Sequence, residues 1–317
     1  MNQKKNFIEE YADISGVQHY LLHYQGKTEA PVLLFIHGGP GQSEAAMAYM
    51  IEEYAERNYT IVYYDQRGAG KTYLKNKKER PNTELLKKDL LGVVCYLKNL
   101  YKKEKIGIIG HSWGSVLGSM FALEHPEHTL CYIGCGQVVN LMENESVGFS
   151  KLKEAIEKSG NRKDQKKLSK IGEYPVPYFD MNVYRKMGMV RSLQGKYKLA
   201  ASADWNMAKL ILKSPIIGMK DIVPFIVGIT VNMQVMKELM SFDLREKGSD
   251  YQVPVFYVLG EEDQQTPIEL GEKYFHEIKA PMKELYVIEK AGHNVMLDNV
   301  EEYRKVICGI VDKVYKF

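Results

Sequence analysis

The chain has 317 residues and a formal net charge of +3 at pH 7, which gives no reason to expect nucleic acid or an anionic membrane as a partner. Hydrophobic residues make up 45% of the chain and charged residues 26%, which is the composition of an ordinary globular protein. The four cysteines form no Cys-x-x-Cys pair and no histidine cluster accompanies them, so neither a zinc site nor a disulfide framework is expected.

The first residues are polar and lead into a mixed segment without an apolar signal core, so we expect a cytoplasmic protein. Strand-like and helix-like stretches then alternate along the chain. The expected strands are residues 17–24, 32–36, 60–64, 106–109 and 129–133, and the expected helices are residues 44–57, 83–101 and 113–124. Short apolar strands separated by helices predict a parallel sheet that is covered on both faces.

The alternation stops at residues 139–248, where helix-like and loop segments follow one another without a convincing strand. It resumes with a strand at 253–259, a helix from Pro267, a strand at 285–288 and a last helix at 300–315. We therefore predict one α/β core, formed by residues 1–138 and 249–317, with residues 139–248 inserted as a helical cap. The most apolar stretch, residues 216–236, contains charged residues and a proline and is not expected to span a membrane.

A Gly-x-Ser-x-Gly pattern at residues 110–114 stands between an expected strand and an expected helix. This context is typical of α/β-hydrolases, where the serine occupies a sharp, strained turn that exposes its hydroxyl. Gly110 and Gly114 leave room for the backbone to pass closely, and the start of the following helix directs free N–H groups at developing negative charge. We therefore predict that Ser112 is the nucleophile of a serine hydrolase.

A serine nucleophile needs a base, and the base needs a carboxylate that orients it; in this fold they follow in the order Ser, Asp or Glu, His. Asp263 comes just after an expected strand, where the sites of α/β proteins are built. Its other plausible role, capping the helix from Pro267, is assigned to Thr266 instead. Asp263 is therefore the predicted acid, with Glu262 as the main rival.

His293 is the predicted base, because it follows the next expected strand and comes in the required chain order. The other seven histidines fit this position less well. His111 adjoins the nucleophile but is expected to point away from it at the turn.

An oxyanion hole needs two backbone N–H donors, one of which comes from the residue after the nucleophile, here Trp113. The other is expected from the loop at residues 37–41, which reads His-Gly-Gly-Pro-Gly, and Gly39 is the predicted donor. The segment at 67–72 ends like a phosphate-binding loop, but Asp65 stands where that motif requires its first glycine. We interpret the segment as a loop near the site, and we expect no metal or organic cofactor.

The motifs at 37–41 and 65–72, the latter reading Asp-Gln-Arg-Gly-Ala-Gly-Lys-Thr, together with the Ser112 turn resemble the proline iminopeptidase family of α/β-hydrolases. The resemblance covers about residues 7–138 and 250–317. It implies an α/β-hydrolase fold, with a mostly parallel sheet flanked by helices and a helical cap inserted after the sixth core strand. It also implies that Ser112, Asp263 and His293 form a catalytic triad in an enzyme that removes N-terminal residues from peptides.

The cap departs from the pattern of this family, whose members hold the free amine of the substrate with cap glutamates in W-x-x-W-E and I-E-N-H-like motifs. Here Trp205 is followed by Asn206, and Val231 precedes Asn232 where the second glutamate would stand. A buried ammonium without a carboxylate partner is strongly disfavoured, so a carboxylesterase-type hydrolase of a small apolar ester or amide is the alternative function. Trp205, Asn206 and Asn232 are the candidate substrate-binding residues.

Other cap acids, such as Glu173, Asp204 and Glu238, could supply the amine-binding charge from a different place. A third function, non-catalytic ligand binding, is disfavoured by the intact triad and oxyanion loop. The expected partner is a small molecule or short peptide, with neither nucleic acid nor a membrane, and the sequence pattern predicts no particular oligomeric state.

Overall fold

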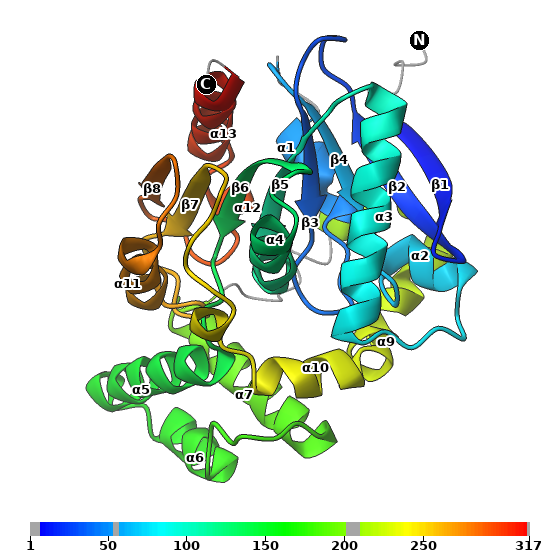
Figure 1. The fold of residues 1–317 in the computed structure, drawn as a ribbon. Coiled ribbons are helices and arrows are strands. Elements are labelled where there is room, and N and C mark those ends of the chain that lie inside the picture. Colours follow the sequence, from blue (N-terminus) through cyan, green and yellow to red (C-terminus); the bar gives the residue numbers. More distant parts are fainter. Residues whose placement is uncertain (1–6, 53–56, 201–209, 316–317) are drawn as a thin grey trace.

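The computed structural model describes residues 7–52, 57–200 and 210–315, which form an eight-stranded sheet in the order β1-β2-β4-β3-β5-β6-β7-β8 (Figure 1). The strands are β1 (Ile8–Ile14), β2 (Val17–Tyr24), β3 (Val32–Ile36), β4 (Thr60–Tyr64), β5 (Ile106–His111), β6 (Thr129–Cys135), β7 (Val255–Gly260) and β8 (Lys283–Ile288). β2 pairs antiparallel with β1 and β4, and the strands from β4 to β8 are parallel. The predicted mostly parallel α/β-hydrolase sheet is confirmed.

Helices cover both faces of this sheet. Those of the core are α1 (Ala48–Glu52), α2 (Gly70–Lys75), α3 (Thr83–Tyr101), α4 (Trp113–Glu124), α11 (Ile268–Glu277), α12 (Val295–Asp298) and α13 (Val300–Tyr315). In β3, Leu34 and Ile36 belong to the hydrophobic cluster with α3, α4 and α11, whereas Leu33 and Phe35 belong to the cluster with α1, α12 and α13. Because successive side chains point to opposite faces and both faces are buried, the inner strands are apolar throughout.

The described part of the insertion after β6 contains helices and no strand, as predicted. Its α-helices are α5 (Leu141–Ser159), α6 (Arg162–Ile171), α7 (Met181–Lys196), α9 (Val223–Val231) and α10 (Met233–Met240). They gather at one end of the sheet (Figure 1). α5 and α7 share a small core of their own, to which Phe149, Leu152 and Val190 contribute. Among the described residues no single helix is long and apolar enough to cross a membrane; only the bent pair 219–231 and 233–240, taken together, reaches that length and composition.

Three core segments differ from the sequence prediction. β1 was not expected, because it is an edge strand in which only Ala12 and Ile14 are buried, and so it carries little apolar alternation. α2 was not expected either, since it is six residues long and begins at the glycine-rich segment. The helix expected at 44–57 is a 3-10 turn followed by the short helix α1 within the described residues.

Candidate active site

Ser112 lies at the turn between β5 and α4, and its backbone has φ 52° and ψ −119°. A positive φ is uncommon for a residue with a side chain, and here the Ser112 N–H donates to the Cys135 carbonyl at 3.0 Å, which ties the turn to β6. A Cβ on Gly114 would lie 2.0 Å from the carbonyl oxygen of Ile36, so only glycine allows α4 to start this close to β3. The structure thus has the sharp strand-turn-helix that the Gly-x-Ser-x-Gly pattern predicts.

Asp263 and His293 are brought together from two loops that follow neighbouring strands, β7 and β8. The His293 Nδ1–H donates to Asp263 Oδ2 at 2.9 Å, and both side chains are buried. The other carboxylate oxygen, Oδ1, accepts the N–H groups of Gln265 at 2.8 Å and Thr266 at 2.9 Å. Burial alone would raise the pKa of Asp263, but the His293 ring and the hydrogen bonds from Thr266 hold it below its usual value. Asp263 therefore remains a carboxylate at neutral pH.

Thr266 has a different role from the predicted N-cap. α11 begins at Ile268 with Pro267 in the capping position, and no side chain accepts a hydrogen bond there. The Thr266 hydroxyl instead donates to Asp263 Oδ2 at 2.6 Å. Asp263 therefore both orients His293 and closes the turn before the helix. The rival carboxylate, Glu262, has an exposed side chain, and the contact with His293 belongs to Asp263.

His293 lies close to the nucleophile turn, because the ring centroids of His293 and His111 are 4.9 Å apart. The Nε2 atom of His293 is buried and has no hydrogen-bond partner among the described residues. With Nδ1 donating its hydrogen to Asp263, Nε2 is the nitrogen that carries the lone pair of the neutral ring. This is the tautomer that a general base requires.

Gly39 and Trp113 line the same cavity as Ser112. Trp113 is the first residue of α4, so its N–H has no acceptor within the helix. The loop that carries Gly39 passes directly over the turn, since a Cβ on Gly38 would lie 3.2 Å from the Cβ of Ser112. The two predicted oxyanion donors therefore come from segments that flank the serine.

Gln66 fixes both of these segments through three hydrogen bonds. Its side-chain amide donates to the His37 carbonyl at 2.9 Å, and its Oε1 accepts the indole N–H of Trp113 at 2.9 Å. Its backbone N–H donates to Nε2 of His37 at 3.0 Å, and burial holds the pKa of His37 below its usual value. In the same segment, Asp65 accepts from the Ser43 hydroxyl at 2.5 Å and from the N–H of Lys71 at 2.7 Å. The segment at 65–72 therefore braces the site, and it lies near the site as interpreted, although residues 70–72 begin helix α2 instead of continuing as a loop.

A cavity of about 680 Å³ lies between the core and the cap. The core contributes Gly39, Ser112 and Trp113 to its wall. The cap contributes five apolar side chains and five polar or charged ones; the apolar ones are Leu141, Met187, Ile229, Met236 and Leu239. Such a wall suits the apolar part of a small substrate.

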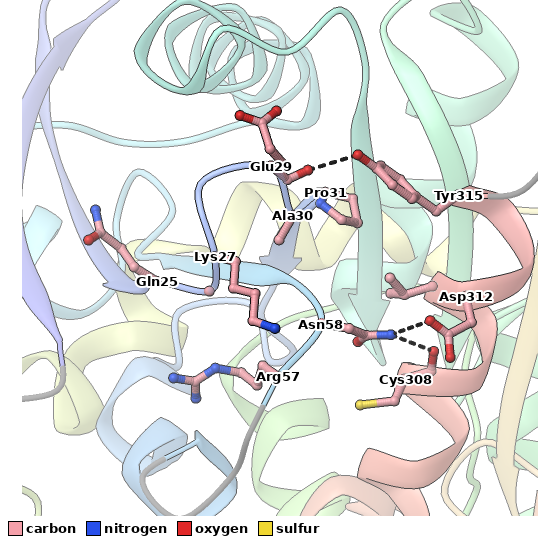
Figure 2. Close-up of a pocket in the computed structure, with 12 residues that line it drawn as sticks. Gln25, Lys27, Glu29, Ala30, Pro31, Arg57, Asn58, Cys308, Asp312 and Tyr315 are labelled. Carbon is pink, nitrogen blue, oxygen red and sulfur yellow. Dashed lines mark hydrogen bonds between the residues drawn. The ribbon is translucent and has the colours of Figure 1, made fainter.

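A second cavity, of about 780 Å³, lies at the opposite end of the sheet, where β3 and β4 begin (Figure 2). Asn58 there donates to the carbonyl of Cys308 at 3.1 Å and to Asp312 at 2.7 Å. None of the five candidate catalytic and oxyanion residues lines it. Although it is larger, it is separate from the chemistry considered above.

Glu145 on α5 is a buried carboxylate in the wall of the first cavity. It accepts hydrogen bonds from Arg191 Nη2 and from the hydroxyl of Tyr174. Arg191 also lines the cavity and donates from Nη1 to Gln194 Oε1 at 2.7 Å. Glu145 was not singled out from the sequence, although it stands four residues after Leu141 on the apolar stripe of its helix, where a charged residue signals a buried role.

The cap acids considered from the sequence do not line this cavity in the described part of the chain. Glu238 accepts hydrogen bonds from Thr83, from N at 2.8 Å and Oγ1 at 2.7 Å. Glu173 has an exposed side chain. Asp204 lies outside the described residues.

Of the three candidate substrate-binding residues, Trp205 and Asn206 also lie outside the described residues. Asn232 is buried, and its amide donates to the carbonyls of Gly68 at 3.0 Å and Gly228 at 2.8 Å. These hydrogen bonds therefore join the cap helix α9 to the glycine-rich loop of the core. Among the described residues, no group of three His, Cys, Asp or Glu side chains could hold a metal ion.

Comparisons with known proteins agree with this architecture. Residues 31–300 match the family model of the alpha/beta hydrolase fold. A protein of Bacillus subtilis named as a probable aminopeptidase is 26% identical over 265 residues, 83% of each chain, and a proline iminopeptidase of Thermoplasma volcanium is 22% identical over 308 residues, 96% of each. The crystal structure of a proline iminopeptidase from Mycobacterium smegmatis has a TM-score of 0.69 at 16% identity, over 97% of this chain and 98% of that one.

Proposed function

This chain belongs to the α/β-hydrolase family, and we propose that it is a serine hydrolase that cleaves an amide or ester through an acyl-enzyme on Ser112. The observation that carries the proposal is the arrangement around one cavity. Ser112 in its strained turn lines this cavity together with Gly39 and Trp113, and the buried Asp263–His293 pair lies beside that turn, which supports the proposed roles of these residues. The relatives named proline iminopeptidase and aminopeptidase support the same reaction class.

Acylation begins when His293 Nε2 takes the proton of the Ser112 hydroxyl while Oγ bonds to the substrate carbonyl carbon. The electron pair of the carbonyl π bond moves to oxygen, where the N–H groups of Trp113 and Gly39 stabilise it. Asp263 stabilises the imidazolium that forms. As the tetrahedral intermediate collapses, the bond to the leaving nitrogen or oxygen breaks and His293 passes the proton to that group.

Deacylation repeats these steps with water as the nucleophile. His293 takes a proton from the water as its oxygen bonds to the acyl carbon, and the acyl–Oγ bond then breaks. The proton returns to Ser112, and the free acid leaves. His293 therefore carries every proton transfer in the cycle, and the backbone donors only stabilise the oxyanion.

Two substrate classes follow from different observations. The relatives favour a short peptide with a free N-terminus. The described cavity wall favours a neutral acyl group, because its charged side chains are already paired, Glu145 with Arg191 and Lys196 with Asp164. We propose a proline iminopeptidase-like hydrolase as the function, and a carboxylesterase acting on small apolar esters as the second candidate.

Labelling with a fluorophosphonate probe and mapping the modified residue tests the proposed nucleophile. We expect the probe to label Ser112, and we expect Ser112→Ala to remove both labelling and turnover of proline arylamides and short acyl esters. The variant should keep the wild-type unfolding temperature, because only one hydroxyl is lost. Labelling at another serine, or wild-type turnover in the variant, would contradict the assignment.

A further inference from the structure

His111 is a buried histidine that the mechanism above does not use, and both of its ring nitrogens face acceptors. Nδ1 lies 2.5 Å from Oε1 of Glu44, and Nε2 lies 2.9 Å from the main-chain carbonyl oxygen of His293. A neutral imidazole has only one N–H, so two such contacts require either an imidazolium beside a carboxylate or a protonated Glu44. In both forms the pair holds one proton between Glu44 and His111 and a second toward His293.

The surroundings favour the imidazolium. Burial lowers the pKa of His111, but the Glu44 carboxylate and the His293 carbonyl outweigh it, so the pKa of His111 is raised above its usual value. The charged and titratable groups that face the ring are Glu44 from the segment after the oxyanion loop, His293 and Asp263 from the loops after the last two strands, and His37. The nearest opposite charge is Glu44, whose second oxygen is buried without a partner among the described residues.

These contacts join the segments whose relative placement the mechanism needs. His111 is the last residue of β5 and directly precedes the nucleophile. Glu44 follows the loop that carries Gly39. The carbonyl of His293 belongs to the base, whose ring must keep Nδ1 on Asp263 and turn Nε2 to Ser112. The His111 ring therefore links the strand before the nucleophile to the loop of the base. The link is a hydrogen bond to the main-chain carbonyl of His293 and does not involve the reacting atoms.

We propose that His111, held by Glu44, is a positioning residue for His293: its Nε2–H fixes the main-chain carbonyl of the base and thereby the placement of the base beside Ser112. The inference rests on the proposed function, because it assigns a role in the action of that base. His111 does not line the cavity, and its hydrogen bonds go to Glu44 and to a main-chain carbonyl rather than to the reacting atoms. Its loss is therefore expected to lower the rate of acylation without changing substrate binding.

The experiment compares His111→Leu, His111→Gln and Glu44→Gln by kcat, KM and the rate of fluorophosphonate labelling. A misplaced base lowers rates by up to about 100-fold, so we expect His111→Leu to lose about 10- to 100-fold in kcat and in labelling rate with little change in KM. The amide of glutamine can donate to the same carbonyl, so His111→Gln should recover most of this loss. The matched control is His23→Leu, a buried histidine that contacts Tyr101 and Glu10, outside the site.

The pH profile separates positioning from a general packing role. The raised pKa of His111 means that both of its donors are present at low pH. As the pH rises through the folded pKa, the donor to the His293 carbonyl is lost, because the one remaining hydrogen stays on Nδ1 beside the Glu44 carboxylate. The wild type should therefore lose kcat on the alkaline side, and His111→Gln, whose donor does not titrate, should lack this decline. Glu44→Gln should move the decline to lower pH, because the neutral amide no longer favours the imidazolium.

The outcomes distinguish this inference from the proposed function. If the wild type is not labelled at Ser112, the proposed function fails. If the wild type is labelled and the His111 and Glu44 variants are labelled at its rate, the positioning role is wrong and the proposed function stands. Should His111→Leu fail to fold, His111→Gln and Glu44→Gln decide, since an unchanged alkaline decline in both overturns the inference.

Discussion

The two oxygens of the Asp263 carboxylate receive four hydrogen bonds, from His293, from the Thr266 hydroxyl and from two backbone N–H groups. The sequence placed Asp263 after a strand and assigned the capping role to Thr266. It could not show that one carboxylate serves both the base and the turn, because that depends on how the chain closes before α11. The Glu44–His111 contact was equally hidden, since its two residues are 67 positions apart in the sequence.

Asp263→Asn should keep the shape of this side chain and remove the charge that stabilises the His293 imidazolium. We expect kcat to fall about 10⁴-fold, as it does when the acid of a serine triad is amidated. Steady-state kinetics on the best substrate measure the change, with Glu262→Gln as the control because its side chain is exposed. If Asp263→Asn is nearly silent and Glu262→Gln is not, the wrong carboxylate has been assigned.

The same carboxyl group makes stability depend on pH. Its pKa is depressed in the folded protein, so it stabilises the fold above its unfolded pKa of about 3.9, and this stabilisation is lost as the pH falls through the folded pKa. Asp263→Asn should therefore lower the free energy of unfolding more at pH 7 than at pH 3. Urea unfolding of both proteins at the two pH values gives the difference, and an equal loss at both would show that ionisation of Asp263 does not contribute.

At the scale of elements, apolar runs predicted the core strands and long helices well, because burial on both faces leaves a continuous apolar signal. They failed at β1, an exposed edge strand, and at α2, which is too short to show a period. In the cap, the periodicity indicated helices but not which faces meet. The buried Glu145 and the bridging amide of Asn232 both depend on that packing.

Asn232 joins two elements that are far apart in the sequence, since its amide donates to Gly68 in the core and to Gly228 in α9. Asn232→Ala would leave the buried Gly68 carbonyl without this donor, which costs about 1–3 kcal/mol. We expect a lower free energy of unfolding by that amount in urea titrations, with the exposed Asn182→Ala unchanged. If Asn232 binds substrate instead, KM will rise while stability stays the same.

At the scale of the whole molecule, the cavity is built from segments that the fold alone brings together. Its wall combines Gly39, Ser112, Leu141 and Ile229, which come from the core and from both ends of the described cap. Of the five core residues predicted as catalytic or oxyanion residues, Gly39, Ser112 and Trp113 line this cavity, because the carboxyl ends of parallel strands share one edge of the sheet. The charged side chains of the wall come from cap helices, and the way these helices pack depends on tertiary contacts. The sequence alone therefore could not predict which charges face the cavity.

That character leads to a prediction about specificity. The charged side chains lining the described cavity are Glu145, Arg191 and Lys196. The carboxylate of Glu145 is already paired with Arg191, so the wall offers no free carboxylate to bind the ammonium of a substrate. We therefore expect kcat/KM for an N-acetylated substrate or a simple acyl ester to equal or exceed that for the matching free-amine substrate. Parallel assays on a proline arylamide, its N-acetyl form and a short acyl ester measure this ratio.

The Glu145–Arg191 pair explains how the opposite result could arise, and two variants test it. Arg191→Met would free Glu145 to bind an ammonium, so the ratio of kcat/KM for the free-amine substrate to that for the N-acetylated substrate should rise in this variant. In the double variant Arg191→Met/Glu145→Gln this ratio should return to the wild-type value. A well-placed buried carboxylate can discriminate by several kcal/mol. If the wild type already prefers the free amine by more than about a hundredfold, roughly 2.7 kcal/mol, and Glu145→Gln abolishes that preference, then Glu145 binds the amine and the carboxylesterase alternative falls.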